Sequence, residues 1–285
     1  MRKDESERIG MADMDISLIP ITSAQNPKVK AWASLLEKKH RDRAGTFLIE
    51  GVHLLQEALK AVGIVSIEAV AVDADRGWPE ELAGARLPER TPVYALPASV
   101  MAKCTGTDTP PPVFAVARKP RYGLDALYRE GGFVVALDGV RDPGNAGTLI
   151  RAADAVGADA VVLGRGSVDP YNPKTVRSTM GSLFHLPVVE GDLAELLPEA
   201  KRRGIRLVGA SLDARLSCYE FDWRPACWLL LGNESNGLSP AVSALLDERV
   251  LIPMRGQAES LNVAMAGAVL MHEAMRQRYF ASGRG

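Results

Sequence analysis

Two regions of alternating apolar and polar segments divide the chain, and each predicts its own helices and strands. In the first region, short apolar runs predict strands at "GTFLIEG", "SIEAVAVD", "TPVYALP" and "PPVFAVARK". An Asn-Pro start followed by helical spacing predicts one helix over "NPKVKAWASLLEKKHR", and a second is expected at "GVHLLQEALKAV". The pattern indicates a small α/β domain over residues 16–120, preceded by a disordered tail at 1–15.

The second region covers residues 132–285 and follows a linker at 121–131. Strands are expected at "FVVALDG", "AVVLG", "HLPVV", "IRLVGAS", "CWLLLGN" and "RVLIPM". Helices are expected at 146–157, near 173–183, at 192–203, near 239–246 and from about Ser260 to Phe280. Strands that alternate with helices predict a parallel sheet, which binds its ligands at the carboxyl ends of the strands.

Composition excludes several classes of protein. A chain of 285 residues that is 47% hydrophobic can bury a full core, yet no apolar run is long enough to span a bilayer and no signal peptide is apparent at the start. The cysteines Cys104, Cys218 and Cys227 lie far apart, and the histidines lack metal-ligand spacing. We therefore expect a cytoplasmic protein without a disulfide framework, a membrane segment or a metal site.

The charge pattern leaves room for a local contact with nucleic acid. The net charge of −1 excludes a globally basic binding protein, but residues 28–43 are strongly basic. Lys28, Lys30 and Arg41 are therefore candidates for contacts with RNA phosphates. A solvated helix face with ordinary lysines would show the same pattern.

The strand at "FVVALDG" leads into a glycine-lined turn, "DPGNAGTLIR", and then into a helix. Gly144 and Gly147 permit close approach of the backbone, and Asn145 places a donor and an acceptor at the helix start. Arg151 lies away from the expected buried face, towards solvent or a ligand. The turn has neither the Gly-Lys-Ser/Thr of a Walker A loop nor GxGxxG. An ordinary helix start with a surface arginine has the same pattern.

Two later loops also follow apolar strands. "WLLLGNESNGLSP" lets a ligand lie against the backbone and places Glu234 at the mouth of the sheet. "VLIPMRGQAESLNVAMAGAVLMHEAM" ends a strand near Ile252 and begins a helix, with Ser260 as its expected N-cap. Considered singly, each loop could be an ordinary solvated connection that ends in a helix cap, as well as part of a ligand site.

Together and in this order, the three loops resemble the signature motifs of the SpoU (TrmH) family of RNA ribose 2′-O-methyltransferases, within the SPOUT class. The resemblance rests on "NAGTLIR" at 145–151, "LLLGNESNGLS" at 229–239 and "IPMRGQAESLNVAMAGAVLMHE" at 252–273. It covers residues 132–280 and includes "DPYNPKTVRSTMGSLFHLPVV" at 169–189. The N-terminal region resembles the substrate-binding domain of many members, which is related to a ribosomal RNA-binding protein fold.

The resemblance implies an α/β fold whose C-terminal part forms a trefoil knot, which is rare, and a homodimer packed through the knots. It also implies that S-adenosylmethionine binds in the knot, held mainly by backbone groups. Gly232, Ile252 and Leu261 match the family's cofactor contacts, with Asn233 and Met254 as neighbours. Glycine for close approach and apolar side chains around an adenine suit such a site.

The implied reaction is methyl transfer to a ribose 2′-hydroxyl of RNA, with ribosomal RNA expected and tRNA as the alternative. Arg151 matches the arginine that activates the hydroxyl. It either takes the proton after transient deprotonation, or clamps a phosphate and orients the ribose while water or a phosphate oxygen takes the proton. Four further positions match the active site and would orient these groups: Asn145, Glu234, Ser260 and Asn262.

The segment between the first two motifs adds two expected phosphate contacts, Lys174 and Arg177, although an ordinary charged helix surface would also carry them. Two other functions remain as alternatives. The strand, glycine loop and helix at 137–157 are also found in nicotinamide-dependent oxidoreductases, but GxGxxG is missing. A non-catalytic RNA-binding module could keep the fold, but the intact set of motif residues argues against it.

Overall fold

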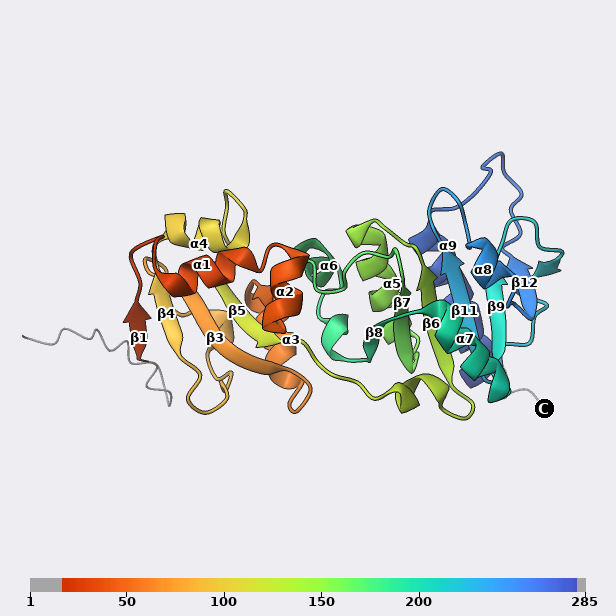
Figure 1. Cartoon of the computed structure of the whole chain (residues 1–285), viewed down its shortest axis with the longest axis horizontal. Helices are drawn as coiled ribbons and strands as arrows, with labels where there is room; N and C mark the ends of the chain where they lie inside the picture. Colours follow the sequence, from red (N-terminus) through yellow and green to blue (C-terminus); the bar gives the residue numbers. More distant parts are fainter. Residues whose placement is uncertain (1–16, 281–285) are drawn as a thin grey trace, which may run out of the picture. The chain divides into compact units, whose positions relative to one another are not determined.

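The computed structural model describes residues 17–280, which divide into two compact units (Figure 1). Unit 1 runs to Pro120 and includes Tyr171–Arg177, whereas unit 2 comprises Arg121–Pro170 and the chain from Ser178 onward. The tail expected at 1–15 lies outside the described residues. Among the helices of residues 17–280, none is both long enough and apolar enough to cross a membrane.

Unit 1 is built on a mixed five-stranded sheet in the order β1-β4-β3-β5-β2. β5 pairs antiparallel with β2 and β3, and β4 pairs parallel with β1 and β3. The strands are β1 (Leu18–Pro20), β2 (Thr46–Glu50), β3 (Ser66–Asp73), β4 (Val93–Leu96) and β5 (Val113–Arg118). The helices are α1 (Pro27–Ser34), α2 (Lys38–Ala44), α3 (Val52–Lys60), α4 (Ala98–Thr105) and α6 (Pro173–Ser178).

An aromatic cluster lies at the centre of one core of unit 1. The Trp32 ring on α1 packs edge-on against Tyr94 and Phe114, with centroids 5.2 and 5.8 Å apart. Such edge-to-face pairs add to the stabilisation that burial of the rings provides. The apolar face of α1 thus packs on β4 and β5, two strands that the sequence predicts.

One predicted helix of unit 1 is divided in two, which corrects the sequence interpretation. Asn26 caps the helix as expected, but α1 ends at Ser34 and α2 begins at Lys38. At the break the carbonyl of Leu35 accepts a hydrogen bond from Nη1 of Arg41 at 2.6 Å. The turn therefore buries the Leu35 side chain in the core and gives the buried guanidinium of Arg41 a hydrogen-bond acceptor.

Unit 2 is built on a parallel seven-stranded sheet in the order β10-β12-β9-β11-β6-β7-β8, which confirms the predicted fold class. The strands are β6 (Phe133–Asp138), β7 (Ala160–Gly164), β8 (Val188–Gly191), β9 (Arg206–Ala210), β10 (Leu216–Ser217), β11 (Cys227–Gly232) and β12 (Glu248–Leu251). The helices are α5 (Pro143–Ala155), α7 (Leu193–Arg202), α8 (Pro240–Ser243) and α9 (Val263–Met275).

Helices cover both faces of this sheet (Figure 1). α7 and α8 share a core with alternate residues of the central strands, among them Trp228 and Leu230. On the other face α5 packs against α9, so that a Cβ at Gly267 of α9 would meet side chains of Leu149 and Leu231. The carboxyl ends of β6, β11 and β12 lie at one edge, where a parallel sheet binds its ligands.

Several boundaries in the second half of the chain differ from the expected ones. α6 ends at Ser178 and a separate 3₁₀ turn covers Ser182–Phe184, so the helix expected near 173–183 is broken. Met180 and Gly181 between them have positive φ angles, which an α-helix does not accept. α8 is shorter than expected, and α9 gives way at Arg276–Phe280 to a π-helical turn. The expected linker contains a 3₁₀ turn, Leu124–Tyr128.

Candidate active site

Three loops of unit 2 converge where β6 and β11 end and α9 begins. The Asn145 side chain on α5 donates from Nδ2 to Oε1 of Glu234 at 3.0 Å. The Asn262 side chain donates from Nδ2 to Oδ1 of Asn145, also at 3.0 Å. A continuous chain of hydrogen bonds therefore joins one residue from each of the three motifs. Three of the five predicted catalytic residues are brought together in this way.

Glu234 is the centre of this arrangement. Oε1 accepts from the backbone N–H of Asp142 at 3.2 Å as well as from Asn145. Oε2 accepts from the backbone N–H of Arg141 and from Nδ2 of Asn233, both at 3.3 Å. Four donors fill the acceptor sites of a carboxylate. Glu234 therefore fixes the turn before α5 rather than presenting a free base.

The electrostatics of Glu234 agree with this role. Partial burial acts to raise the pKa of its carboxyl group. The hydrogen bonds from Asn145 and from the backbone outweigh burial, so that the pKa lies below the ordinary value of 4.5. The carboxylate is consequently ionised at neutral pH, and its charge strengthens each hydrogen bond that it accepts.

Asn262, rather than Ser260, caps α9, which corrects the expected N-cap. Its Oδ1 accepts from the backbone N–H of Ala264 at 2.9 Å and of Met265 at 3.4 Å. Asn262 thus uses its oxygen for the helix and its Nδ2 for Asn145. Ser260 lies two residues before this cap, in the exposed stretch 253–262, and lines a cavity described below.

Arg151 does not join the hydrogen-bonded chain. It lies six residues after Asn145 on α5, about 9 Å along the helix axis at 1.5 Å per residue. The side chain is exposed, and within residues 17–280 its guanidinium forms no ion pair or hydrogen bond. Leu149, Ile150 and Ala153 of the same helix are buried. Arg151 is therefore available to a ligand.

A cavity of about 610 Å³ opens beside Glu234, and its volume suits a ligand of cofactor size. All of the residues expected to contact the cofactor line it: Gly232, Asn233, Ile252, Met254 and Leu261. Its wall combines apolar side chains with the polar segment 233–236. An adenine ring and a charged amino-acid end require this mixture, so the lining fits S-adenosylmethionine.

The cavity also includes residues that the sequence reasoning missed. Ser211, Leu212 and Asp213 follow β9 and form part of its wall. Because β9 lies next to β11 in the sheet, their carboxyl ends meet at the same edge. The expected parallel sheet predicted this edge, but the order of its strands was needed to place this loop there.

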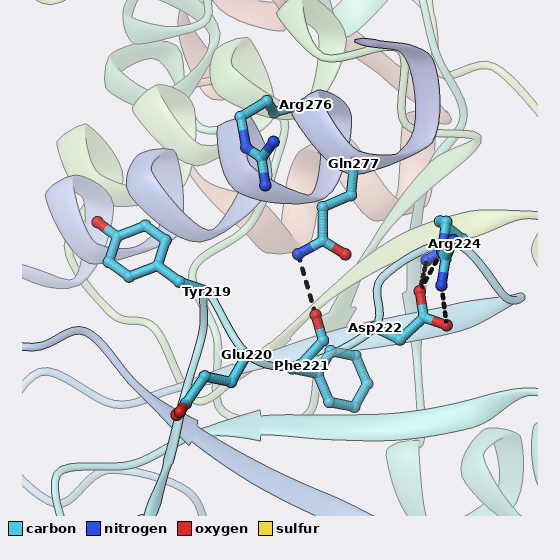
Figure 2. Close-up of a pocket in the computed structure, with 7 residues that line it drawn as sticks. All are labelled: Tyr219, Glu220, Phe221, Asp222, Arg224, Arg276 and Gln277. Carbon is cyan, nitrogen blue, oxygen red and sulfur yellow. Dashed lines mark hydrogen bonds and ion pairs between the residues drawn. The ribbon is translucent and has the colours of Figure 1, made fainter. Parts of the chain in front are cut away.

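A smaller cavity of about 270 Å³ lies at the end of α9 and contains no predicted site residue (Figure 2). Its arginines are paired with carboxylates: Arg224 with Asp222 at 2.7 Å, and Arg276 with Glu273 at 2.8 Å. Gln277 donates to the carbonyl of Phe221 at 3.0 Å (Figure 2). The bond from Gln277 fastens the turn that follows α9 to the segment before β11, and the predicted site residues lie at the larger cavity.

The predicted RNA contacts lie in unit 1. Lys28 and Lys30 are exposed on α1, with Nζ of Lys28 5.4 Å from the ring centroid of Tyr94. Arg41 is 1% exposed and bonded to the Leu35 carbonyl, so it cannot reach a phosphate and is withdrawn as an RNA contact. Two exposed cations lie on α6: Lys174 and Arg177. No group of three or more metal-ligating side chains occurs within residues 17–280.

Comparison with protein families gives two matches. A model of the SpoU rRNA Methylase family matches residues 132–272, which hold the three loops. A model of the MRM3-like substrate binding domain matches residues 26–115. The two matches fall on the two halves of the chain that the sequence pattern separates.

Individual relatives resemble the chain over nearly its full length. The chain is 40% identical over 252 residues to the Bacillus subtilis 23S rRNA (guanosine(2553)-2′-O)-methyltransferase RlmP, covering 88% of this chain and 97% of the relative. It is 35% identical over 273 residues to the Streptomyces viridochromogenes 23S rRNA (uridine(2479)-2′-O)-methyltransferase, covering 92% and 93%.

Solved structures of methyltransferases are also similar to this chain over nearly its full length. The SpoU methyltransferase AviRb from Streptomyces viridochromogenes, in complex with AdoMet, is similar with a TM-score of 0.82 and 35% identity, covering 91% of this chain and 100% of that one. An AdoMet-bound rRNA methyltransferase from Sinorhizobium meliloti has a TM-score of 0.78 and 32% identity, covering 91% and 98%.

Proposed function

Because the chain belongs to the SpoU rRNA methylase family, we propose that it transfers a methyl group from S-adenosylmethionine to a ribose 2′-hydroxyl of 23S ribosomal RNA. The observation that carries this proposal is the hydrogen-bonded chain from Asn262 through Asn145 to Glu234, beside a cavity of cofactor size. The full-length relatives named above act on 23S rRNA, which supports ribosomal RNA over tRNA.

S-adenosylmethionine is the cofactor, and it supplies a methyl group activated by its sulfonium when it is bound. Gly232 lets the turn that ends at Gly237 and Leu238 lie against β11, where it lines the cavity, and Ile252 and Leu261 provide apolar surface for the adenine. Ser260 lies at the polar side of the same cavity. Solved neighbours that contain AdoMet support this assignment.

In the proposed mechanism Arg151 binds a phosphate next to the target ribose and orients its 2′-hydroxyl towards the methyl group. The exposed guanidinium suits this role because it has no partner within residues 17–280. Arginine keeps its proton at neutral pH, so water or a phosphate oxygen takes the hydroxyl proton. Positioning of this kind lowers the activation free energy by about several kcal/mol, as it does when two reacting groups are held in one molecule. Asn145, Glu234 and Asn262 hold the turn from which α5 presents Arg151.

We assign RNA binding to unit 1 and methyl transfer to unit 2. Lys28, Lys30, Lys174 and Arg177 remain the proposed phosphate contacts, since all four side chains are exposed. We also propose that the protein acts in the cytoplasm, because the free thiols of Cys104, Cys218 and Cys227 agree with a reducing compartment.

We further propose that the C-terminal segment is threaded as a trefoil knot and that two copies form a homodimer. The match of residues 132–272 to the SpoU rRNA Methylase family supports the knot that the resemblance of the three motifs implies. The exposed apolar side chains of Met265, Tyr279 and Phe280, along α9 and its extension, support pairing with a second copy. Sedimentation velocity of the full chain should give the mass of a dimer, and a monomer at micromolar concentration would contradict the pairing.

The substrate is tested with S-adenosylmethionine labelled in its methyl group, using ribosomal RNA and bulk tRNA from cells that lack this protein. We expect label in 23S rRNA and none in tRNA. Label in tRNA alone would agree with methyl transfer to RNA but would contradict ribosomal RNA as the substrate. If neither RNA accepts label from a protein that binds the cofactor, the proposed reaction on free RNA is wrong.

A further inference from the structure

Unit 1 buries a carboxylate of which one oxygen has a hydrogen-bond partner and the other has none. The side chain of Glu50, the last residue of β2, is 4% exposed, and its Oε2 accepts a hydrogen bond from Nη1 of Arg177 at 2.5 Å. Its Oε1 is also buried but has no hydrogen-bond partner. Burial raises the pKa of the Glu50 carboxyl group, against the effect of Arg177. A group in this state costs free energy.

Stability does not explain this pair. The carboxylate of this pair is removed from water while the guanidinium stays half exposed, so burial of the Glu50 charge costs free energy that attraction to a partly solvated partner returns only in part. The balance is less favourable still because Oε1 of Glu50 is buried without a hydrogen-bond partner. Thr175, also fully buried, has an unpartnered Oγ1 on the same helix as Arg177. Unpaired buried groups of this kind call for a functional reason.

Arg177 shows what the pair achieves. Its side chain is 49% exposed, and apart from the bond to Glu50 it forms no hydrogen bond within residues 17–280. A guanidinium has five N–H donors, so most of them remain available to an acceptor from solvent. Glu50 sits at the end of a paired strand and anchors one nitrogen. An exposed arginine without such an anchor would sample many rotamers.

We propose that Glu50 is a positioning residue that holds the Arg177 guanidinium ready for an RNA phosphate. The inference rests on the proposed function, because it makes unit 1 a binding surface for the substrate RNA. A fixed guanidinium loses less conformational entropy when it binds phosphate, and its fork geometry matches two phosphate oxygens. Glu50 itself does not touch the RNA.

The test is a double-mutant cycle on the full-length enzyme, with the Kd for 23S rRNA measured at several salt concentrations. Arg177→Ala should weaken binding by on the order of three- to tenfold and reduce the slope of log Kd against log salt by about 1. Glu50→Leu should weaken binding in the same way without lowering the melting temperature. The double variant should bind no more weakly than Arg177→Ala alone. Glu50→Gln keeps an acceptor and should recover part of the affinity.

The matched control is Glu68→Leu, because Glu68 forms a more exposed pair with Arg118 at 2.6 Å in the same unit. It should leave RNA affinity unchanged. Additive losses in the cycle, or a Glu50→Leu protein that is less stable but binds RNA normally, would overturn the inference. If Glu50→Leu does not fold, the other two variants decide. Wild-type RNA affinity of Arg177→Ala would overturn the inference, and so would a Glu50→Gln protein that loses no more affinity than the control. Failure of the wild-type enzyme to bind and methylate rRNA would instead refute the proposed function, and the inference with it.

Discussion

Gly232, the last residue of β11, has no room for a methyl group. A Cβ at this position would lie less than 2.5 Å from C and O of Gly237 and from N of Leu238. Carbon atoms pack at about 3.5–4.0 Å, so the overlap is roughly 1 Å or more. All three atoms belong to the backbone, and no side-chain rotation can relieve the clash. Because Gly232 also lines the larger cavity, the strain would reach the cofactor site.

We expect Gly232→Ala to lower the free energy of unfolding by about 3 kcal/mol, the upper end of the range for overpacked cores. Binding of S-adenosylmethionine should weaken by on the order of tenfold or more, because the segment 232–238 must move. Gly267→Ala is a milder case, since the added Cβ would meet side chains of Leu149 and Leu231, the latter at 2.8 Å. Those side chains can shift, so about 1–3 kcal/mol is expected.

The matched control is Gly123→Ala, where no atom lies within 4 Å and φ is −69°. It should be neutral or slightly stabilising, because alanine restricts the unfolded chain. Urea unfolding gives the stability of each variant, and isothermal titration gives its affinity for the cofactor. A Gly232→Ala protein with wild-type stability and affinity would refute the close approach of the two backbone segments.

Two further predictions concern ionisation. The folded pKa of Glu234 lies below 4.5, so its carboxylate stabilises the fold above that pH, and the contribution is lost as the pH falls through the folded pKa. The stability difference between wild type and Glu234→Gln should therefore be largest near neutral pH and shrink as the pH falls below 4.5 and through the folded pKa, and urea unfolding that gives a constant difference would contradict this. Burial raises the pKa of the Cys104 and Cys227 thiols to about 11. Neither thiol should react with a disulfide reagent at about pH 8 until the protein unfolds, and prompt labelling of either would show that its site opens.

The local sequence pattern was sufficient for most of the sheet in unit 2. "FVVALD" and "CWLLLG" are continuous apolar runs because β6 and β11 are buried on both faces, which is why the runs predict central strands. The parallel arrangement then placed the following loops at one edge. The same arrangement predicts that Glu234 lies at the mouth of the sheet, where it accepts the hydrogen bond from Asn145.

Contacts between distant segments could not be predicted in this way. Asn145 and Asn262 are 117 positions apart, and their hydrogen bond depends on the packing of α5 against α9. Arg41 belongs to a basic run, and nothing in its spacing reveals that the helix breaks and buries it. Ser260 and Asn262 are both good capping residues, and only the backbone decides between them.

The most direct test of the account is to treat 23S rRNA, labelled by this enzyme from S-adenosylmethionine, with alkali. A ribose 2′-O-methyl group blocks hydrolysis of the adjoining linkage, so we predict that the label appears in an alkali-resistant dinucleotide. Arg151→Ala should yield no such product while binding the cofactor with an unchanged Kd. Label in ordinary mononucleotides, or normal turnover by Arg151→Ala, would contradict ribose methylation directed by this arginine.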